Sequence, residues 1–88
     1  MLTQKVTILN KRGLHARASA KFVKLAESFE ADVTVRKDDT AVSGCSIMGL
    51  MMLAAAPGCE IELTAAGPSA ESAMAALVEL VANKFDED

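Results

Sequence analysis

The chain has 88 residues, a mass of 9.2 kDa and a net charge of −3, which suits one small domain over residues 1–88. Only 3% of its residues are aromatic, so it lacks the rings on which nucleic-acid modules stack bases, and we expect no nucleic-acid partner. Its longest apolar stretch, Ile47 to Pro57, is too short for a transmembrane helix of about 20 residues. The first residues also lack the pattern of a signal peptide. We therefore expect a cytoplasmic protein without membrane insertion.

The first half of the chain predicts a strand, a helix and a hairpin. Residues 2–9 alternate between apolar and polar side chains, as a half-buried strand does, and a polar loop with the turn residue Gly13 follows. Over residues 16–29, apolar side chains recur at the spacing of an amphipathic helix. Residues 32–37 alternate again, and a tight turn leads them into a short partner strand over residues 40–43.

The second half predicts a helix, a strand and a last helix. A short apolar helix spans residues 46–53 and stops before Pro57, and residues 60–65 alternate as a strand. Ser69 is the expected N-cap of the last helix, whose apolar stripe extends to Phe85. The order β-α-β-β-α-β-α predicts a two-layer α/β (α+β) domain with mainly antiparallel strands. A ferredoxin-like regulatory or binding module fits this pattern nearly as well.

The two cysteines, Cys45 and Cys59, are predicted to be free thiols. The helix expected between them would be about 12 Å long, whereas the Cα atoms of a disulfide lie within about 7 Å of each other. Together with His15, the only histidine, they do not supply an evident metal site. We therefore expect no metal.

Charge is unevenly distributed along the chain. Residues 1–44 carry eight basic and five acidic side chains, whereas residues 45–88 carry one basic and seven acidic ones. Every charged residue between Lys5 and Glu27 is basic, and this stretch surrounds His15. Such a stretch is usually a solvated face, but it would also attract an anion or an acidic partner.

His15 directly precedes the first predicted helix. The first amide N–H groups of a helix lack intrahelical acceptors and bind anions. A phosphoryl group on the imidazole would therefore accept hydrogen bonds from the amides of Ala16 and Arg17, and the Arg17 guanidinium would add a charge-assisted contact. The plain alternative is a surface or capping histidine in a basic segment.

Two segments resemble one known family. Gly13 to Arg17 (GLHAR) resembles the active-site segment, and Ser46 to Met51 (SIMGLM) the regulatory-serine segment, of the histidine-containing phosphocarrier proteins (HPr). These proteins belong to the bacterial phosphoenolpyruvate-dependent phosphotransferase system. The spacing of the two segments, the length and the element order agree over nearly the whole chain.

The resemblance implies a fold and a relay function. The fold is an open-faced β-sandwich, a four-stranded antiparallel sheet with three helices on one face. His15 would accept a phosphoryl group from phosphorylated enzyme I on its δ1 nitrogen and pass it to a IIA-type protein, with Arg17 holding the group. Most of the family has proline after the arginine, where this chain has Ala18. This difference leaves open whether the relay serves sugar transport or nitrogen-related regulation.

Ser46 is expected to cap the second helix, whose residues are small or hydrophobic all round. Such a helix is either fully buried or packed on one side and exposed on the other. The resemblance favours the second arrangement, with Ile47, Met48 and Met51 docking enzyme I and the acceptor proteins. It also implies that an HPr kinase phosphorylates Ser46, which would place negative charge beside the docking surface.

The sequence, with this resemblance, therefore predicts a monomeric phosphocarrier that relays a phosphoryl group, needs no cofactor and does not itself turn over a small substrate. Two other interpretations remain from the residues alone. One is a ferredoxin-like interaction module without covalent chemistry. The other is an anion- or RNA-binding domain that uses the basic stretch around His15.

Overall fold

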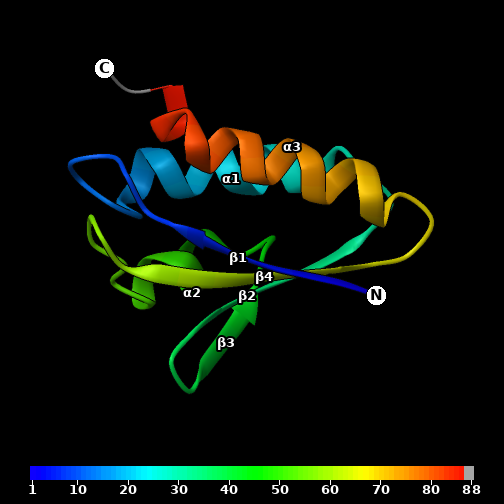
Figure 1. Cartoon of the computed structure of the whole chain (residues 1–88), viewed down its shortest axis with the longest axis horizontal. Coiled ribbons are helices and arrows are strands. Elements are labelled where there is room, and N and C mark those ends of the chain that lie inside the picture. Colours follow the sequence, from blue (N-terminus) through cyan, green and yellow to red (C-terminus); the bar gives the residue numbers. More distant parts are fainter. Residues whose placement is uncertain (87–88) are drawn as a thin grey trace.

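All seven predicted elements are present in the computed structural model, which describes residues 1–86 (Figure 1). They follow the predicted order β-α-β-β-α-β-α. The strands are β1 (Leu2–Thr7), β2 (Asp32–Lys37), β3 (Thr40–Ser43) and β4 (Glu60–Ala66). The helices are α1 (Ala16–Glu27), α2 (Ile47–Met52) and α3 (Ala70–Ala82).

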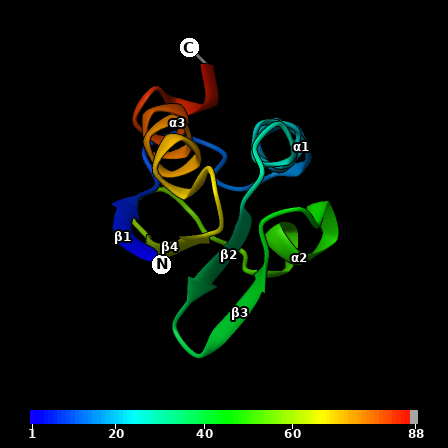
Figure 2. The ribbon, with the colours of Figure 1, turned by 90° about the vertical axis from the view of Figure 1, so that its right-hand side faces the viewer.

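The four strands form one antiparallel sheet in the order β1-β4-β2-β3. In β4, which lies between β1 and β2, the side chains of Ile61, Leu63 and Ala65 are buried and alternate with more exposed ones. This alternation places one apolar sheet face against the helices and leaves the other face uncovered, as Figure 2 shows. The predicted open-faced sandwich is therefore confirmed.

Two groups of helices cover the apolar face of the sheet, α3 on one side and α1 with α2 on the other. α3 packs against β1 and β4, and α1 lies between α3 and α2 (Figure 2). In α1 the predicted apolar stripe is fully buried at Ala18, Phe22 and Ala26. Leu25 and Phe29 are only partly buried, and Phe29 lies beyond the end of the helix at Glu27.

Two predicted elements end earlier than their apolar patterns. β1 stops at Thr7, because the Ile8 amide bonds the Cys59 carbonyl (2.8 Å) outside the ladder, and Leu9 is exposed. α3 stops at Ala82, and the chain then adopts a left-handed turn in which Phe85 has a φ of 56°. Phe85 is nonetheless fully buried, so its place in the core was predicted correctly and its place in the helix was not.

Two further expectations concern the thiols and the membrane. Cys45 is exposed and Cys59 half-buried, and both thiols are free, as predicted. Within residues 1–86, none of the helices combines the length and the apolar character needed to cross a bilayer.

Candidate functional site

His15 is the N-cap residue of α1, as the sequence predicted. Its backbone is extended (φ −77°, ψ 179°), and its Nδ1 accepts a hydrogen bond from the Arg17 amide at 3.3 Å. A ring nitrogen that accepts a hydrogen bond carries a lone pair and no proton. The imidazole is half-buried, whereas Ala16 and Arg17 are exposed. The structure thus brings a nitrogen lone pair and the positive end of a helix dipole together at the surface.

The loop before His15 fits closely against the segment that follows α2. Gly13 has a φ of +62°, and a Cβ atom built there would lie 2.0 Å from the carbonyl oxygen of Ala55. The next amide, that of Leu14, donates to the same oxygen at 2.9 Å. Only glycine combines this backbone conformation with this close approach. The turn glycine that the sequence indicated therefore fixes the direction in which the chain enters α1.

Two buried polar side chains brace the same loop, and the sequence did not single them out. Asn10 Nδ2 donates to the Gly13 carbonyl at 2.8 Å, and Ser19 Oγ donates to the Leu14 carbonyl at 3.2 Å. A signal was present for Ser19, which precedes Phe22 on the buried face of α1 by three residues, the spacing of neighbours on one helix face. No comparable pattern marks Asn10 within its polar loop.

The basic stretch forms an exposed surface around His15 with one exception. Lys11, Arg12, Arg17 and Lys24 are exposed. Lys21 is half-buried, and its Nζ donates to the Phe85 carbonyl at 2.7 Å, so it fastens α1 to the turn after α3. The remaining charges favour the approach of an anion or an acidic partner.

Ser46 is the N-cap of α2, and its Oγ accepts the Gly49 amide at 3.0 Å. The serine is half-buried, so its side chain is partly accessible. The third predicted cap behaves differently: Ser69 stands at the N-cap of α3 but makes no side-chain capping bond.

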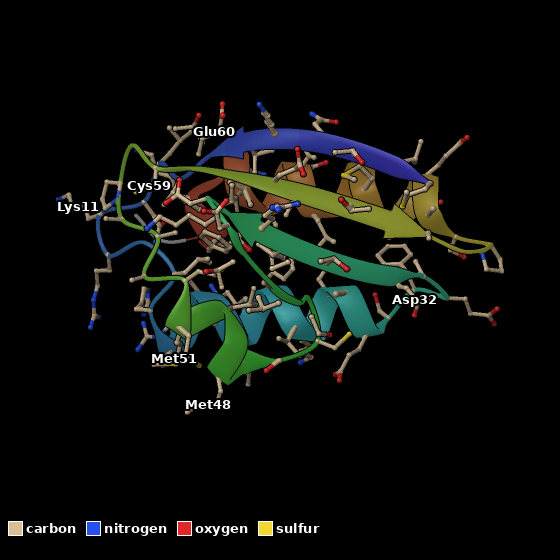
Figure 3. All side chains as sticks on the ribbon, turned by 90° about the horizontal axis from the view of Figure 1, so that it is seen from below. Lys11, Asp32, Met48, Met51, Cys59 and Glu60 are labelled. Atoms are coloured by element: carbon tan, nitrogen blue, oxygen red, sulfur yellow. The ribbon has the colours of Figure 1, made fainter. Side chains whose placement is uncertain are left out.

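α2 has a buried side and an exposed side, which resolves the choice that its sequence left open. Leu50 is fully buried in the core. On the exposed side, Met48 is 70% and Met52 76% exposed, and both Met48 and Met51 project outward from the helix in Figure 3. We call the four exposed hydrophobic residues of this helix the α2 patch: Ile47, Met48, Met51 and Met52. Met52 is the member that the sequence analysis did not include.

The α2 patch and His15 lie at the same end of the molecule. α2 packs beside α1, and the loop that holds Lys11 lies at the end of the molecule where α2 is found (Figures 1 and 3). Lys37 Nζ donates to the Leu53 carbonyl at 3.2 Å and so ties the end of α2 to β2. Two residues later, Ala55 receives the Leu14 amide. The segment that follows the patch is therefore in direct contact with the loop that leads to His15.

Comparison with known proteins gives a consistent result. The family model described as "PTS HPr component phosphorylation site" matches residues 2–83. The phosphocarrier protein HPr of Neisseria meningitidis is 53% identical over 99% of this chain and 98% of its own. The phosphocarrier protein NPr of Escherichia coli is 43% identical over 97% of this chain and 96% of its own.

The fold comparison agrees. The crystal structure of HPr from Thermoanaerobacter tengcongensis is 42% identical and superposes with a TM-score of 0.95, covering 100% of this chain and 99% of that one. These matches assign the chain to a phosphocarrier family, not to a family of ferredoxin-like interaction modules. The chain belongs to the HPr family, the phosphocarrier proteins of the bacterial phosphoenolpyruvate-dependent phosphotransferase system.

Proposed function

We propose that His15 is the residue on which this phosphocarrier receives and releases its phosphoryl group. One observation carries the proposal: Nδ1 of His15 faces the first turn of α1, 3.3 Å from the Arg17 amide nitrogen. That nitrogen has the lone pair needed for attack on phosphorus. The first amides of α1 and the exposed Arg17 side chain lie where they could donate hydrogen bonds to a phosphoryl group on Nδ1.

The transfer then needs few movements. The Arg17 amide releases Nδ1, whose lone pair attacks phosphorus; the new N–P bond forms, and the bond to the donor breaks with its electron pair leaving on the donor. The amides of Ala16 and Arg17 and the Arg17 guanidinium hold the phosphoryl oxygens. The reverse attack by an acceptor protein returns His15 to its starting state. The chemistry uses only side chains and backbone, with no cofactor.

Membership of the family implies partners within the phosphotransferase system, such as enzyme I and IIA proteins. We infer that both bind the α2 patch and the exposed basic residues of α1, one after the other. An apolar surface with methionines adapts to several partners, and the basic rim selects acidic ones. The IIA-type acceptor decides whether the relay serves sugar transport or nitrogen-related regulation. We further propose that the protein works as a cytoplasmic monomer and binds no nucleic acid.

Ser46 is the proposed regulatory position. Phosphorylation of Ser46 by an HPr kinase would place nearly two negative charges at the start of α2, beside Ile47 and Met48. Helix α2 itself tolerates an anion there, because the charge lies at its N-terminus. The docked partner would lose apolar contact, so phosphorylation would slow the relay without unfolding the carrier.

The test is phosphoryl transfer from phosphoenolpyruvate through enzyme I, followed by mass spectrometry and site mapping. The wild-type protein should gain an acid-labile adduct of about 80 Da on His15, as a phosphohistidine requires. His15→Ala should gain none, with an unchanged circular dichroism spectrum. Assays with sugar-specific and regulatory IIA proteins then identify the acceptor. Phosphorylation of the His15→Ala protein at another residue would refute the assignment.

Arg17 allows a graded test of the same site. Arg17→Ala should slow transfer about 10-fold or more, because one charge-assisted contact is worth roughly 1.5–3 kcal/mol. Stability should change little, since the side chain is exposed. Arg17→Lys should recover part of the rate but not the forked geometry. A wild-type rate for Arg17→Ala would mean that the guanidinium takes no part.

A further inference from the structure

The interior of the described residues contains two buried polar side chains, Asn10 and Ser19, which are 1% and 0% exposed. A buried polar group destabilises a fold unless it is hydrogen-bonded, and an apolar residue usually serves packing better. Both side chains lie at the same place, beneath the loop that leads to His15. Their shared position indicates a role at the site that packing alone does not explain.

Ser19 holds two consecutive carbonyl groups. Its amide donates to the His15 carbonyl at 2.9 Å, which is a normal helical bond, and its hydroxyl donates to the Leu14 carbonyl at 3.2 Å. The peptide planes on both sides of the His15 Cα atom are therefore fastened to one residue of the first helical turn.

Asn10 holds the carbonyl before these two. Its Nδ2 donates to the Gly13 carbonyl at 2.8 Å, while the Gly13 amide donates back to the Asn10 carbonyl at 3.2 Å. From the other side, Ala55 accepts the Leu14 amide at 2.9 Å. Three successive carbonyls, of residues 13, 14 and 15, are thus fixed by Asn10 and Ser19.

We propose that Asn10 and Ser19 are positioning residues for phosphoryl transfer: they hold the backbone that carries the imidazole of His15, so that Nδ1 faces the first turn of α1 when a partner docks. The inference rests on His15 being the phosphoryl acceptor. Because the backbone is fixed, only the side-chain torsions of His15 remain free to rotate. Most of the entropic cost of orienting the imidazole is therefore met when the protein folds, before a partner docks. Neither side chain reaches the surface, so neither takes part in docking.

Because both side chains are buried, their substitution should lower kcat but leave KM nearly unchanged when the phosphocarrier is the varied substrate of enzyme I. Ser19→Ala removes the hydroxyl with little loss of volume, and Asn10→Asp replaces the Nδ2 donor with an oxygen of similar size. Each should lower kcat about tenfold and leave KM within about twofold of the wild-type value. The Arg17 amide resonance should shift in both variants, since its partner Nδ1 is no longer held in place.

The matched control is Val81→Ala, a buried truncation in α3, which should lower the melting temperature but leave kcat and the Arg17 resonance unchanged. Ser19→Thr keeps the hydroxyl and should recover much of the rate. Wild-type kcat and an unmoved Arg17 resonance in Ser19→Ala and Asn10→Asp would overturn the proposal. The proposal would also be overturned if Ser19→Ala and Asn10→Asp lost no more kcat than a Val81→Ala protein of equal stability. An adduct mapped to a residue other than His15 in the wild-type protein would instead refute the proposed function.

Discussion

The starts of α1 and α2 use the same local device in different surroundings. In each, an N-cap residue with an extended backbone accepts a backbone amide through its side chain: His15 at 3.3 Å and Ser46 at 3.0 Å. α1 has 12 residues and buries five of them, and the loop before it is fixed by buried groups. α2 has six residues and buries only Leu50.

This difference shows that the surroundings, more than the cap itself, decide what a helix start is suited for. At α1 the cap is the proposed nucleophile, on a backbone fixed by buried groups, and the first turn would hold an anion placed there. At α2 the cap adjoins the α2 patch, so an anion placed there changes what the patch can bind. In our proposal, one helix start carries a phosphoryl group and the other responds to one.

A large loss of stability is expected when the fixed loop before α1 is disrupted at Gly13. Gly13→Ala should lower the free energy of unfolding by more than about 2 kcal/mol, because it adds a left-handed alanine and a clash with a backbone oxygen 2.0 Å away. Chemical denaturation measures the loss. Gly58→Ala is the control, since Gly58 also has a positive φ (+89°) but open space around it. Equal losses at both positions would show that the contact with Ala55 adds nothing.

The two sides of α2 provide a second contrast. Leu50→Ala should cost about 2–5 kcal/mol of stability, because the side chain is fully buried. Met48→Asp should change stability by less than about 0.5 kcal/mol, yet raise the KM of enzyme I for the carrier by placing charge in the α2 patch. Thermal melts and transfer kinetics on both variants separate the effects. A Met48→Asp protein that docks normally would remove Met48 from the docking surface.

The smallest expected change in stability comes from substitutions of the α2 cap, Ser46. Ser46→Ala loses the bond to the Gly49 amide and should cost about 1 kcal/mol, with transfer unchanged. Ser46→Asp retains a capping oxygen and adds a charge that favours the helix start by about 0.3–1 kcal/mol. It should therefore melt at or above the wild-type temperature while transferring more slowly. If Ser46→Asp transferred at the wild-type rate, charge at this cap would not regulate docking.

The sequence predicted those features whose causes are local. A histidine directly before an amphipathic pattern marks a helix start, and the structure places His15 there. The hairpin of β2 and β3 has the predicted boundaries, because strand alternation and a tight turn are short-range signals. The choice between a buried and a two-sided α2 needed the structure, since methionine and leucine look alike in a hydrophobic pattern.

Features that depend on distant parts of the chain were not predictable in this way. Asn10 reads as a polar loop residue, and its burial follows only from the packing around the loop before α1. Leu9 belongs to the strand that the sequence predicts over residues 2–9, but it lies beyond the end of β1 and is exposed. Phe85 fits the periodicity of α3 but lies beyond its end, and a left-handed turn of the backbone places its side chain in the core.

The bond between Lys21 and the Phe85 carbonyl has a consequence for how the protein is made. It joins residues 64 positions apart, and β1 likewise pairs with β4 through Leu2 and Ala65. At about 5–20 residues per second, synthesis of those 64 residues takes about 3–13 s, far longer than a helix needs to form. Until residue 55 has been made, about halfway through that interval, Gly13 has no Ala55 to pack against. The contact that fixes the loop before His15 therefore forms only after synthesis has passed into the second half of the chain.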